Sequence, residues 1–305
     1  MLISNPFGSA YLVPTVYLLS SLLGATLVPM LYIVRLDVGR LMGHVLFRRW
    51  RTWAVIAPLY VLCVLGGQVT TLLLVAFLVF QGLREYGRLV GLPASYQRTL
   101  LAMGLLSLPV AVVWPDRYYL VTPLFLIVAT LQPLVSGDVR DGVRHLTFTV
   151  FGWALIAWFL GHLLLIQAQV EEGSGFLLAI GLATALSDVG AFTVGKTLGR
   201  HQMAPVVSPN KTWEGVAGNI LGAYLGAGLI WYVLQPQSLP LAIVALPAVI
   251  AVAAVWGDLT ESAIKREFEA KDAGSWLPGF GGLLDRIDSL LLVAPLSCFF
   301  LVLAT

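Results

Sequence analysis

The sequence predicts an all-α, polytopic integral membrane protein with about ten transmembrane helices and a cytoplasm-facing polar site in its C-terminal half. Composition is the first reason. Hydrophobic residues make up 58% of the 305 residues and charged residues only 11%, whereas soluble domains carry about 25% charged residues. The second reason is that long apolar runs follow one another along the chain, with a mean hydropathy of +0.88. A soluble globular domain is therefore excluded.

Ten apolar runs are predicted to cross the membrane, because a helix of about 20 residues covers a hydrocarbon core of about 30 Å. The first run lacks the charged start and the small-residue cleavage site of a secretory signal, so we expect it to remain as a span. The two runs on either side of Gly66 and Gly67 are short for a full crossing. The predicted spans are residues 11–34, 53–65, 69–83, 99–114, 118–136, 148–167, 175–198, 216–235, 239–256 and 288–304.

The loops between these runs divide by basic charge. If they alternate between the two sides, one side receives 17 of the 18 Lys and Arg residues and the other only Arg117. Basic loops stay in the cytoplasm. The sequence therefore predicts a multi-pass protein of the cell membrane whose final charged stretch faces the cytoplasm and whose two termini face outward. The basic loops are residues 35–53, 84–98, 137–147, 196–215 and 257–287.

Charge and cysteine content exclude several other functions. The net charge of +2 is spread along the chain and gives no basic footprint for nucleic acid. Cys63 and Cys298 are the only cysteines and both lie in apolar runs, so neither a disulfide framework nor a cysteine metal site is expected. We expect one continuous membrane domain, with scaffold helices in residues 1–150 and a catalytic half in residues 151–305.

The stretch from residue 256 to residue 290 is the most polar part of the chain. The chain has 18 basic and 16 acidic residues, and this stretch holds 11 of these 34. Charge beside a bilayer is expensive and usually functional. Asp258, Ser262 and Lys265 follow the i, i+4, i+7 spacing of one helical face. This spacing predicts that a carboxylate, a hydroxyl and a cation face the same site.

Asp285 and Asp288, at i and i+3, are predicted to share another helical face. Two groups of carboxylates that face cations indicate a divalent metal and phosphate. Each residue also has a structural alternative. Asp285 and Asp288 could cap the last helix, Glu261 and Lys265 could form a surface ion pair, and Arg266 could face lipid headgroups. The combined spacing, rather than any single residue, favours a site.

A second polar region precedes this stretch. Asp188 lies inside an apolar run, where a charge costs roughly 2.5–3.5 kcal/mol at the bilayer centre; it either has a function or lies near the cytoplasmic end beside a lysine. Residues 208–215 combine hydroxyls, Lys211 and a predicted helix start that Ser208 or Thr212 would cap. Backbone amides at a helix N-terminus beside a lysine form a phosphate site.

Taken in order, these motifs resemble those of the phosphatidate cytidylyltransferase family, which makes CDP-diacylglycerol. Residues 208–215, SPNKTWEG, resemble the family motif SPxKTWEG, and residues 187–200 resemble the aspartate-containing helix before it. Residues 262–288 resemble the C-terminal signature, with its serine, basic residues, double glycine and paired aspartates. The likeness covers roughly residues 180–290. One position departs, because the family has His where this chain has Phe280.

The resemblance implies that the phosphate of phosphatidate attacks the α-phosphorus of CTP with the assistance of Mg²⁺, with a second cation left open. The implied metal ligands are Asp258, Asp285 and Asp288, and the implied catalytic residues are these three and Lys265. A phosphate monoester with a second pKa near about 6 needs no general base. The residues expected to bind substrate are Asp188, Lys196, Ser208, Lys211, Thr212, Ser262, Arg266, Lys271 and Asp272.

Two other functions remain open from the sequence. A CTP-dependent polyprenol or lipid kinase would share the nucleotide site but transfer the terminal phosphoryl group. A non-catalytic lipid-binding or transport paralogue would also carry Asp188, and Phe280, which cannot titrate or bind metal, keeps that alternative open. The expected partners are CTP, phosphatidate or a related anionic lipid, and the bilayer, with a second copy of the chain as a candidate. Nucleic acid is not expected.

Overall fold

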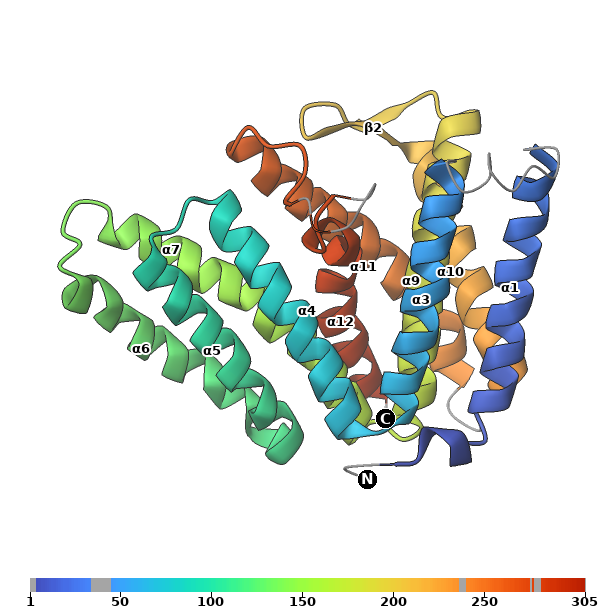
Figure 1. Cartoon of the computed structure of the whole chain (residues 1–305), viewed down its shortest axis with the longest axis horizontal. Helices are drawn as coiled ribbons and strands as arrows, with labels where there is room; N and C mark the ends of the chain where they lie inside the picture. The colour runs from blue at the N-terminus through green and yellow to red at the C-terminus, as the bar shows by residue number, and fades with distance from the viewer. Residues whose placement is uncertain (1–3, 34–44, 236–239, 275, 277–280, 305) are drawn as a thin grey trace.

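The fold is a bundle of helices that run back and forth between two ends of the molecule (Figure 1). The computed structural model describes residues 4–33, 45–235, 240–274, 276 and 281–304. Within these residues, nine helices are long and apolar enough to cross a membrane, and a shorter apolar segment, Trp50–Leu65, makes a tenth candidate. The predicted all-α membrane fold is confirmed.

The elements follow the order of the predicted spans, but several helices are longer than hydropathy alone suggests. Helix α11 extends furthest beyond its predicted span, and α11 and α12 both reach into the charged stretch, from opposite sides. The elements are η1 (Pro6–Gly8), α1 (Leu12–Ile33), α3 (Val45–Leu65), α4 (Gln68–Leu89), α5 (Ala94–Val113), η2 (Pro115–Leu120), α6 (Val121–Ser136), α7 (Gly142–Gly152), the π-helical η3 (Trp153–Trp158), α8 (Phe159–Gln169), α9 (Gly173–Leu198), β1 (Gln202–Ala204), β2 (Ser208–Thr212), α10 (Trp213–Leu234), α11 (Pro240–Glu267) and α12 (Leu284–Ala304).

Burial divides the bundle into a centre and two edges. Helices α7, η3 and α8 follow one another as one continuous helical segment, and 72% of its most apolar stretch is buried. In α1 the corresponding share is 6%. Helix α1 lies at one edge and α6 at the other, with α4 and α12 between them (Figure 1). A helix that is apolar on all sides is stable in a protein centre. The core therefore lies where α8 packs against α4, α5 and α12, so both halves of the chain contribute to it.

Helices α9 and α10 pack face to face through small residues. A Cβ on Gly190 would collide with the carbonyl oxygen of Gly218, and one on Gly222 with that of Leu186. Small residues allow two helix backbones to approach closely within a membrane. This contact fixes the part of α9 that carries Asp188 beside the first turns of α10.

A small antiparallel hairpin joins α9 to α10 at one end of the bundle, the upper end in Figure 1, with Ala204 opposite Ser208. The helix start predicted within residues 208–215 is confirmed, because α10 begins at Trp213, whereas Ser208, the other candidate cap, lies in β2. Pro209 gives a physical reason, since the residue before a proline favours extended backbone. Segment η1 and the C-terminal end of α12 lie at the opposite end of the bundle.

Candidate active site at the hairpin end

Two motifs that are distant in the sequence meet at the hairpin end of the bundle. Lys211, on β2, forms an ion pair with Asp258, on α11, and its Nζ lies 2.7 Å from Oδ2. Ser262, one helical turn further along α11, donates a hydrogen bond from its hydroxyl to Asp258 Oδ1 at 3.3 Å. The lysine of the predicted phosphate site therefore lies against a carboxylate of the C-terminal signature.

Three carboxylates from three helices gather beside this ion pair, and we call Asp188, Asp258 and Asp288 the open cluster. Ser289 links two of them: its hydroxyl donates to Asp188 Oδ1 at 3.0 Å, and its N–H donates to Asp288 Oδ1 at 2.8 Å. The charges of Asp188 and Asp258 act on Asp288. Asp188 is exposed and the other two are half-buried, so all three are accessible to a ligand.

The open cluster carries an excess of negative charge. Lys211 and Arg286 are the cations whose charges reach Asp188, and Lys211 already pairs with Asp258. Three carboxylates thus face two cations. Neighbouring carboxylates repel one another, and a cation that binds between them relieves the repulsion. The electrostatics of the open cluster therefore favour a further cation.

The open cluster suits a hydrated divalent cation better than a closed metal centre. Among the described residues, no three Asp, Glu, His or Cys side chains form a ready-made ligand set. Mg²⁺ does not need one, because it binds one or two protein carboxylates and completes its shell with water and phosphate oxygens. Asp258, on α11, and Asp288, on α12, are carboxylates whose charges interact, and this donor set fits such an ion.

A second group of charges, Glu261, Lys265 and Asp285, is buried between α11 and α12, and we call it the closed cluster. Lys265 Nζ lies 2.8 Å from Asp285 Oδ1 and also contacts Glu261 Oε2. Asp285 accepts further hydrogen bonds from the N–H of Gly282 at 2.7 Å and of Ala273 at 3.0 Å. Glu261 is 1% exposed and Asp285 is 5% exposed. The oxygens of Asp285 are therefore occupied by protein donors.

The structure separates residues that the sequence groups together. The spacing predicts one shared face for Asp285 and Asp288, but the two carboxylates join different clusters. Residues three apart point about 60° apart around a helix, and Asp285 turns back toward the loop before α12. The pair of Glu261 and Lys265, predicted on the surface, does form, but it is buried. A metal-binding role for Asp285 stays a prediction.

The N-terminal end of α10 is held by its own side chains. Thr212 is the N-cap, and its Oγ1 accepts a hydrogen bond from the N–H of Gly215 at 3.1 Å, which confirms one of the two predicted caps. Glu214, in the first turn, accepts a hydrogen bond from the N–H of His201 at 3.2 Å, and its Oε1 lies 2.6 Å from His201 Nδ1. An acid in the first turn also suits the helix dipole. These contacts hold the base of the hairpin that carries Lys211.

Two predicted basic residues make contacts outside the clusters. Arg266 donates a hydrogen bond from Nε to the carbonyl oxygen of Val207 at 3.2 Å, which ties the end of α11 to the hairpin. Lys196 is exposed near the end of α9, with its Nζ 5.5 Å from the ring centroid of Phe192. Arg266 thus supports the hairpin, while Lys196 faces outward from it.

Three predicted substrate-binding residues lie in the hairpin and after α11, and Asp272 approaches the closed cluster, because a Cβ on Gly281 would lie 3.4 Å from Asp272 Oδ1 and 2.9 Å from Asp285 Oδ2. Ser208 lies in β2, and Lys271 and Asp272 are exposed after the end of α11. In the part of the chain that the structure describes, no side-chain hydrogen bond or ion pair joins them to either cluster. Phe280, where the sequence departs from the family pattern, lies outside the described residues. The roles of all four residues stay predictions.

Glu85 is a site residue that the sequence analysis misses. It lies on α4, is 3% exposed, and its Oε2 accepts a hydrogen bond from the N–H of Leu284, the first residue of α12, at 2.8 Å. The hydropathy ends the third span at residue 83 and so places Glu85 in a loop. Helix α4 continues to Leu89. The buried Tyr86, at i+3 from the end of that span, is the signal that could have extended it.

The glycines around the site have steric explanations. Gly281 has a φ of 84°, a conformation that favours glycine. A Cβ on Gly282 would lie 2.5 Å from Glu85 Oε2, and a Cβ on Gly257 would lie 2.5 Å from the carbonyl oxygen of Asp288. The double glycine of the signature therefore lets the loop pass close to α4, and Gly257 lets α11 approach α12 directly below the open cluster.

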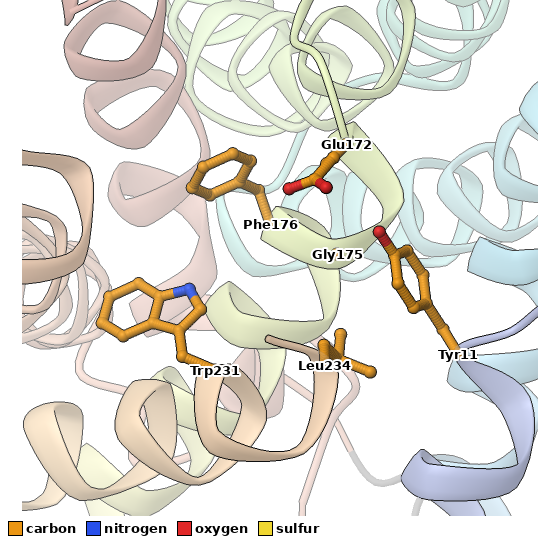
Figure 2. A pocket seen from close by; sticks show the side chains of 6 residues that line it. All are labelled: Tyr11, Glu172, Gly175, Phe176, Trp231 and Leu234. Carbon is orange, nitrogen blue, oxygen red and sulfur yellow. The ribbon is translucent and has the colours of Figure 1, made fainter. Parts of the chain in front are cut away.

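A small cavity lies far from these clusters, where α1 and α9 begin and α10 ends (Figure 2). Its volume of about 10 Å³ leaves room for roughly one water molecule. Burial, together with the charge and hydrogen bond of Glu172, raises the pKa of the Tyr11 hydroxyl. This cavity is too small for a nucleotide. Its lining residues are Tyr11, Glu172, Gly175, Phe176, Trp231 and Leu234.

Comparison with known proteins shows the family of the chain. The chain matches the model of the cytidylyltransferase family over residues 47–304. It belongs to the cytidylyltransferase family. The matched segment extends from α3 to the end of α12 and includes both clusters, so the scaffold helices as well as the site belong to the cytidylyltransferase pattern.

Individual relatives differ in how much of this chain they match. The uncharacterized protein YnbB of Escherichia coli (strain K12) is 33% identical over 270 residues, which cover 83% of this chain and 86% of that protein. The phosphatidate cytidylyltransferase of Mycobacterium leprae (strain TN) is 35% identical over 52% of this chain and 51% of that enzyme. That of Bacillus subtilis (strain 168) is 44% identical over 38% of this chain and 44% of that enzyme. The chain thus aligns with about half the length of these two enzymes.

Proposed function

We propose that this chain is a phosphatidate cytidylyltransferase that transfers CMP from CTP to phosphatidate, giving CDP-diacylglycerol and pyrophosphate. The observation that carries the proposal is the 2.7 Å ion pair between Lys211 and Asp258, because it joins the predicted phosphate site and the open cluster in one place. The phosphatidate cytidylyltransferases among the bacterial relatives support the choice of substrates.

The proposed reaction is a displacement at phosphorus. A phosphate oxygen of phosphatidate forms a bond to the α-phosphorus of CTP. The bond from the α-phosphorus to the oxygen that bridges to the β-phosphorus breaks, and pyrophosphate leaves with the electron pair. The attacking monoester has a second pKa near about 6, so it is largely dianionic at neutral pH and needs no general base. The protein must position two anions and neutralise their charge.

We assign these tasks mainly to the open cluster. Lys211 would leave Asp258 for a phosphate oxygen of the triphosphate when the nucleotide enters. Asp258 and Asp288 would hold Mg²⁺, which when bound neutralises charge on the transferring phosphates. Lys265 receives a positioning role, because its Nζ is engaged by Asp285 in the closed cluster. The open cluster would thus bind the nucleotide and the metal ion, and the closed cluster would position them.

We place the site at the cytoplasmic surface of the cell membrane, because the loops that the sequence predicts on this side hold 17 of the 18 basic residues. Single cysteines in a variant without Cys63 and Cys298 test this orientation. A membrane-impermeant maleimide should label Val206→Cys, at an 88% exposed position in the hairpin, only from the cytoplasm. It should label Glu171→Cys, between α8 and α9, only from outside. Labelling of both from the same side would contradict the orientation.

Incubation of the purified protein with CTP, phosphatidate and Mg²⁺ tests the activity. We expect CDP-diacylglycerol and pyrophosphate in equal amounts. CDP with a phosphorylated lipid would identify a lipid kinase, and lipid binding without turnover would identify a non-catalytic paralogue; either result contradicts the proposal. Removal of the divalent cation with EDTA should abolish turnover, and added Mg²⁺ should restore it.

A further inference from the structure

One face of α4 contacts the segment that leads into α12. Phe77, Gln81 and Glu85 follow the i, i+4, i+8 spacing of a single helical face. The ring of Phe77 lies 5.6 Å from that of Trp276 between centroids. The side-chain amide of Gln81 donates to Glu85 Oε1 at 2.8 Å. A helix of the predicted scaffold half therefore forms a platform for described residues that precede α12, namely Gly274, Trp276 and Gly282.

Glu85 is the part of this platform that reaches the backbone of the loop. Its Oε2 accepts a hydrogen bond from the N–H of Leu284 at 2.8 Å. The glycines on either side leave little room, because a Cβ on Gly282 would lie 2.5 Å from Glu85 Oε2 and 2.9 Å from the backbone nitrogen of Gly274, and one on Gly274 would lie 3.0 Å from Glu85 Cδ. The side chain is 3% exposed. Glu85 thus fills a fitted position between α4 and the loop.

The contact acts at the point where α12 begins. The first four N–H groups of a helix have no partner within the helix, and Glu85 supplies one for Leu284 from 199 residues away in the sequence. Asp285 binds the N–H of Gly282 on the other side of the same turn. Two carboxylates, one from each half of the chain, therefore hold the start of α12. Asp288, of the open cluster, follows one helical turn later.

We infer that Glu85 is a positioning residue for cytidylyl transfer: by anchoring the first N–H of α12, it places Asp288 in the open cluster. The inference rests on the proposed function for its catalytic consequence, but the anchoring itself does not. Glu85 contacts the backbone N–H of Leu284 and not the reacting groups. Its loss should therefore lower kcat more than it raises KM for CTP.

Three variants of the full chain in detergent test the inference. Glu85→Leu removes both acceptors at similar size, Glu85→Gln retains one acceptor oxygen, and Glu171→Gln changes an exposed acid between α8 and α9 as the control. We expect kcat to fall about 10- to 100-fold in Glu85→Leu, less in Glu85→Gln and not in the control, because a displacement of about 1 Å can cost 100-fold. KM for CTP should change less than about threefold.

Hydrogen exchange gives a readout that does not depend on activity. Amides of residues 281–288 should exchange at least about tenfold faster in Glu85→Leu than in the wild type, while those of α9 and α10 stay unchanged. Unchanged exchange in residues 281–288, unchanged kcat, or equal acceleration in every helix would each overturn the inference. If Glu85→Leu does not fold, the same measurements on Glu85→Gln decide. If the wild type has no cytidylyltransferase activity, the proposed function alone is refuted. Hydrogen exchange would still test whether Glu85 anchors the start of α12.

Discussion

The open cluster and the closed cluster both include residues of α11 and α12 at one end of the molecule, but their carboxylates differ in exposure and in hydrogen bonding. Asp258, in the open cluster, has a side chain that is 36% exposed and, within the described part of the chain, one ion-pair partner, Lys211. Asp285, in the closed cluster, is 5% exposed. It accepts hydrogen bonds from Lys265 and from two backbone N–H groups.

The difference determines how easily each carboxylate can exchange its partners. A buried carboxylate that gives up its donors leaves polar groups unsatisfied, at a cost of about 1–3 kcal/mol or more. A partly exposed ion pair contributes only about 0–1 kcal/mol, so Asp258 can exchange Lys211 for a cation or a ligand at little cost. The comparison therefore assigns binding to the open cluster and support of the loop to the closed cluster.

The largest expected effect tests the open cluster. Asp258→Asn removes a carboxylate that is proposed to hold Mg²⁺, and turnover should fall at least about 100-fold, because bound metal contributes several kcal/mol to the transition state. The melting temperature in detergent should stay close to that of the wild type, since the side chain is partly exposed. Asp116→Asn, at an exposed acid in η2, is the matched control. Near-normal turnover in Asp258→Asn would remove that residue from the mechanism.

Asp285→Asn should distinguish the role of the closed cluster from that of the open cluster. An asparagine keeps one acceptor but points an amide donor toward the N–H groups of Gly282 and Ala273. We expect a loss of about 1–3 kcal/mol in stability together with reduced turnover. Parallel measurement of melting temperature and kcat checks this. Lost turnover at the wild-type melting temperature would instead support the sequence prediction that Asp285 binds metal.

Gly257→Ala tests whether the two clusters depend on the close approach of α11 and α12. The new methyl group would lie 2.5 Å from the carbonyl oxygen of Asp288 and 3.1 Å from that of Ser289, so the helices must separate. Overpacking of this kind costs typically about 1–3 kcal/mol, and we expect lower stability and lower turnover. Gly228→Ala, on α10, is the control, because a Cβ there meets nothing within 4 Å. Equal behaviour of the two variants would contradict the steric argument.

The smallest expected effect concerns the support of Lys211. Thr212→Val removes the hydroxyl that caps α10 while it keeps the shape, and Thr212→Ser keeps the hydroxyl. A lost N-cap costs about 0.5–2 kcal/mol, so Thr212→Val should melt at a lower temperature than Thr212→Ser and show a raised KM for CTP. A Thr212→Val protein with the stability of Thr212→Ser would show that the cap does not hold the hairpin.

Several features of the site are predictable from the sequence because they depend on neighbours along the chain. The helical face of Asp258, Ser262 and Lys265 follows from spacing, and α11 extends through all three residues. The cap at Thr212 follows from its residue type before a helix. The strand at Ser208 does not follow, because it depends on pairing with β1.

The sequence by itself determined the membrane class, the order of the spans and the residue types of the site, because hydropathy, length and motif spacing are local properties. Only the tertiary structure decided which carboxylates are open and which are closed. It also brought Glu85 to Leu284 across 199 residues of chain. The physical reason is that burial and the choice of hydrogen-bond partner depend on segments that meet only after folding. Asp285 and Asp288 therefore look equivalent in the sequence, and their environments separate them.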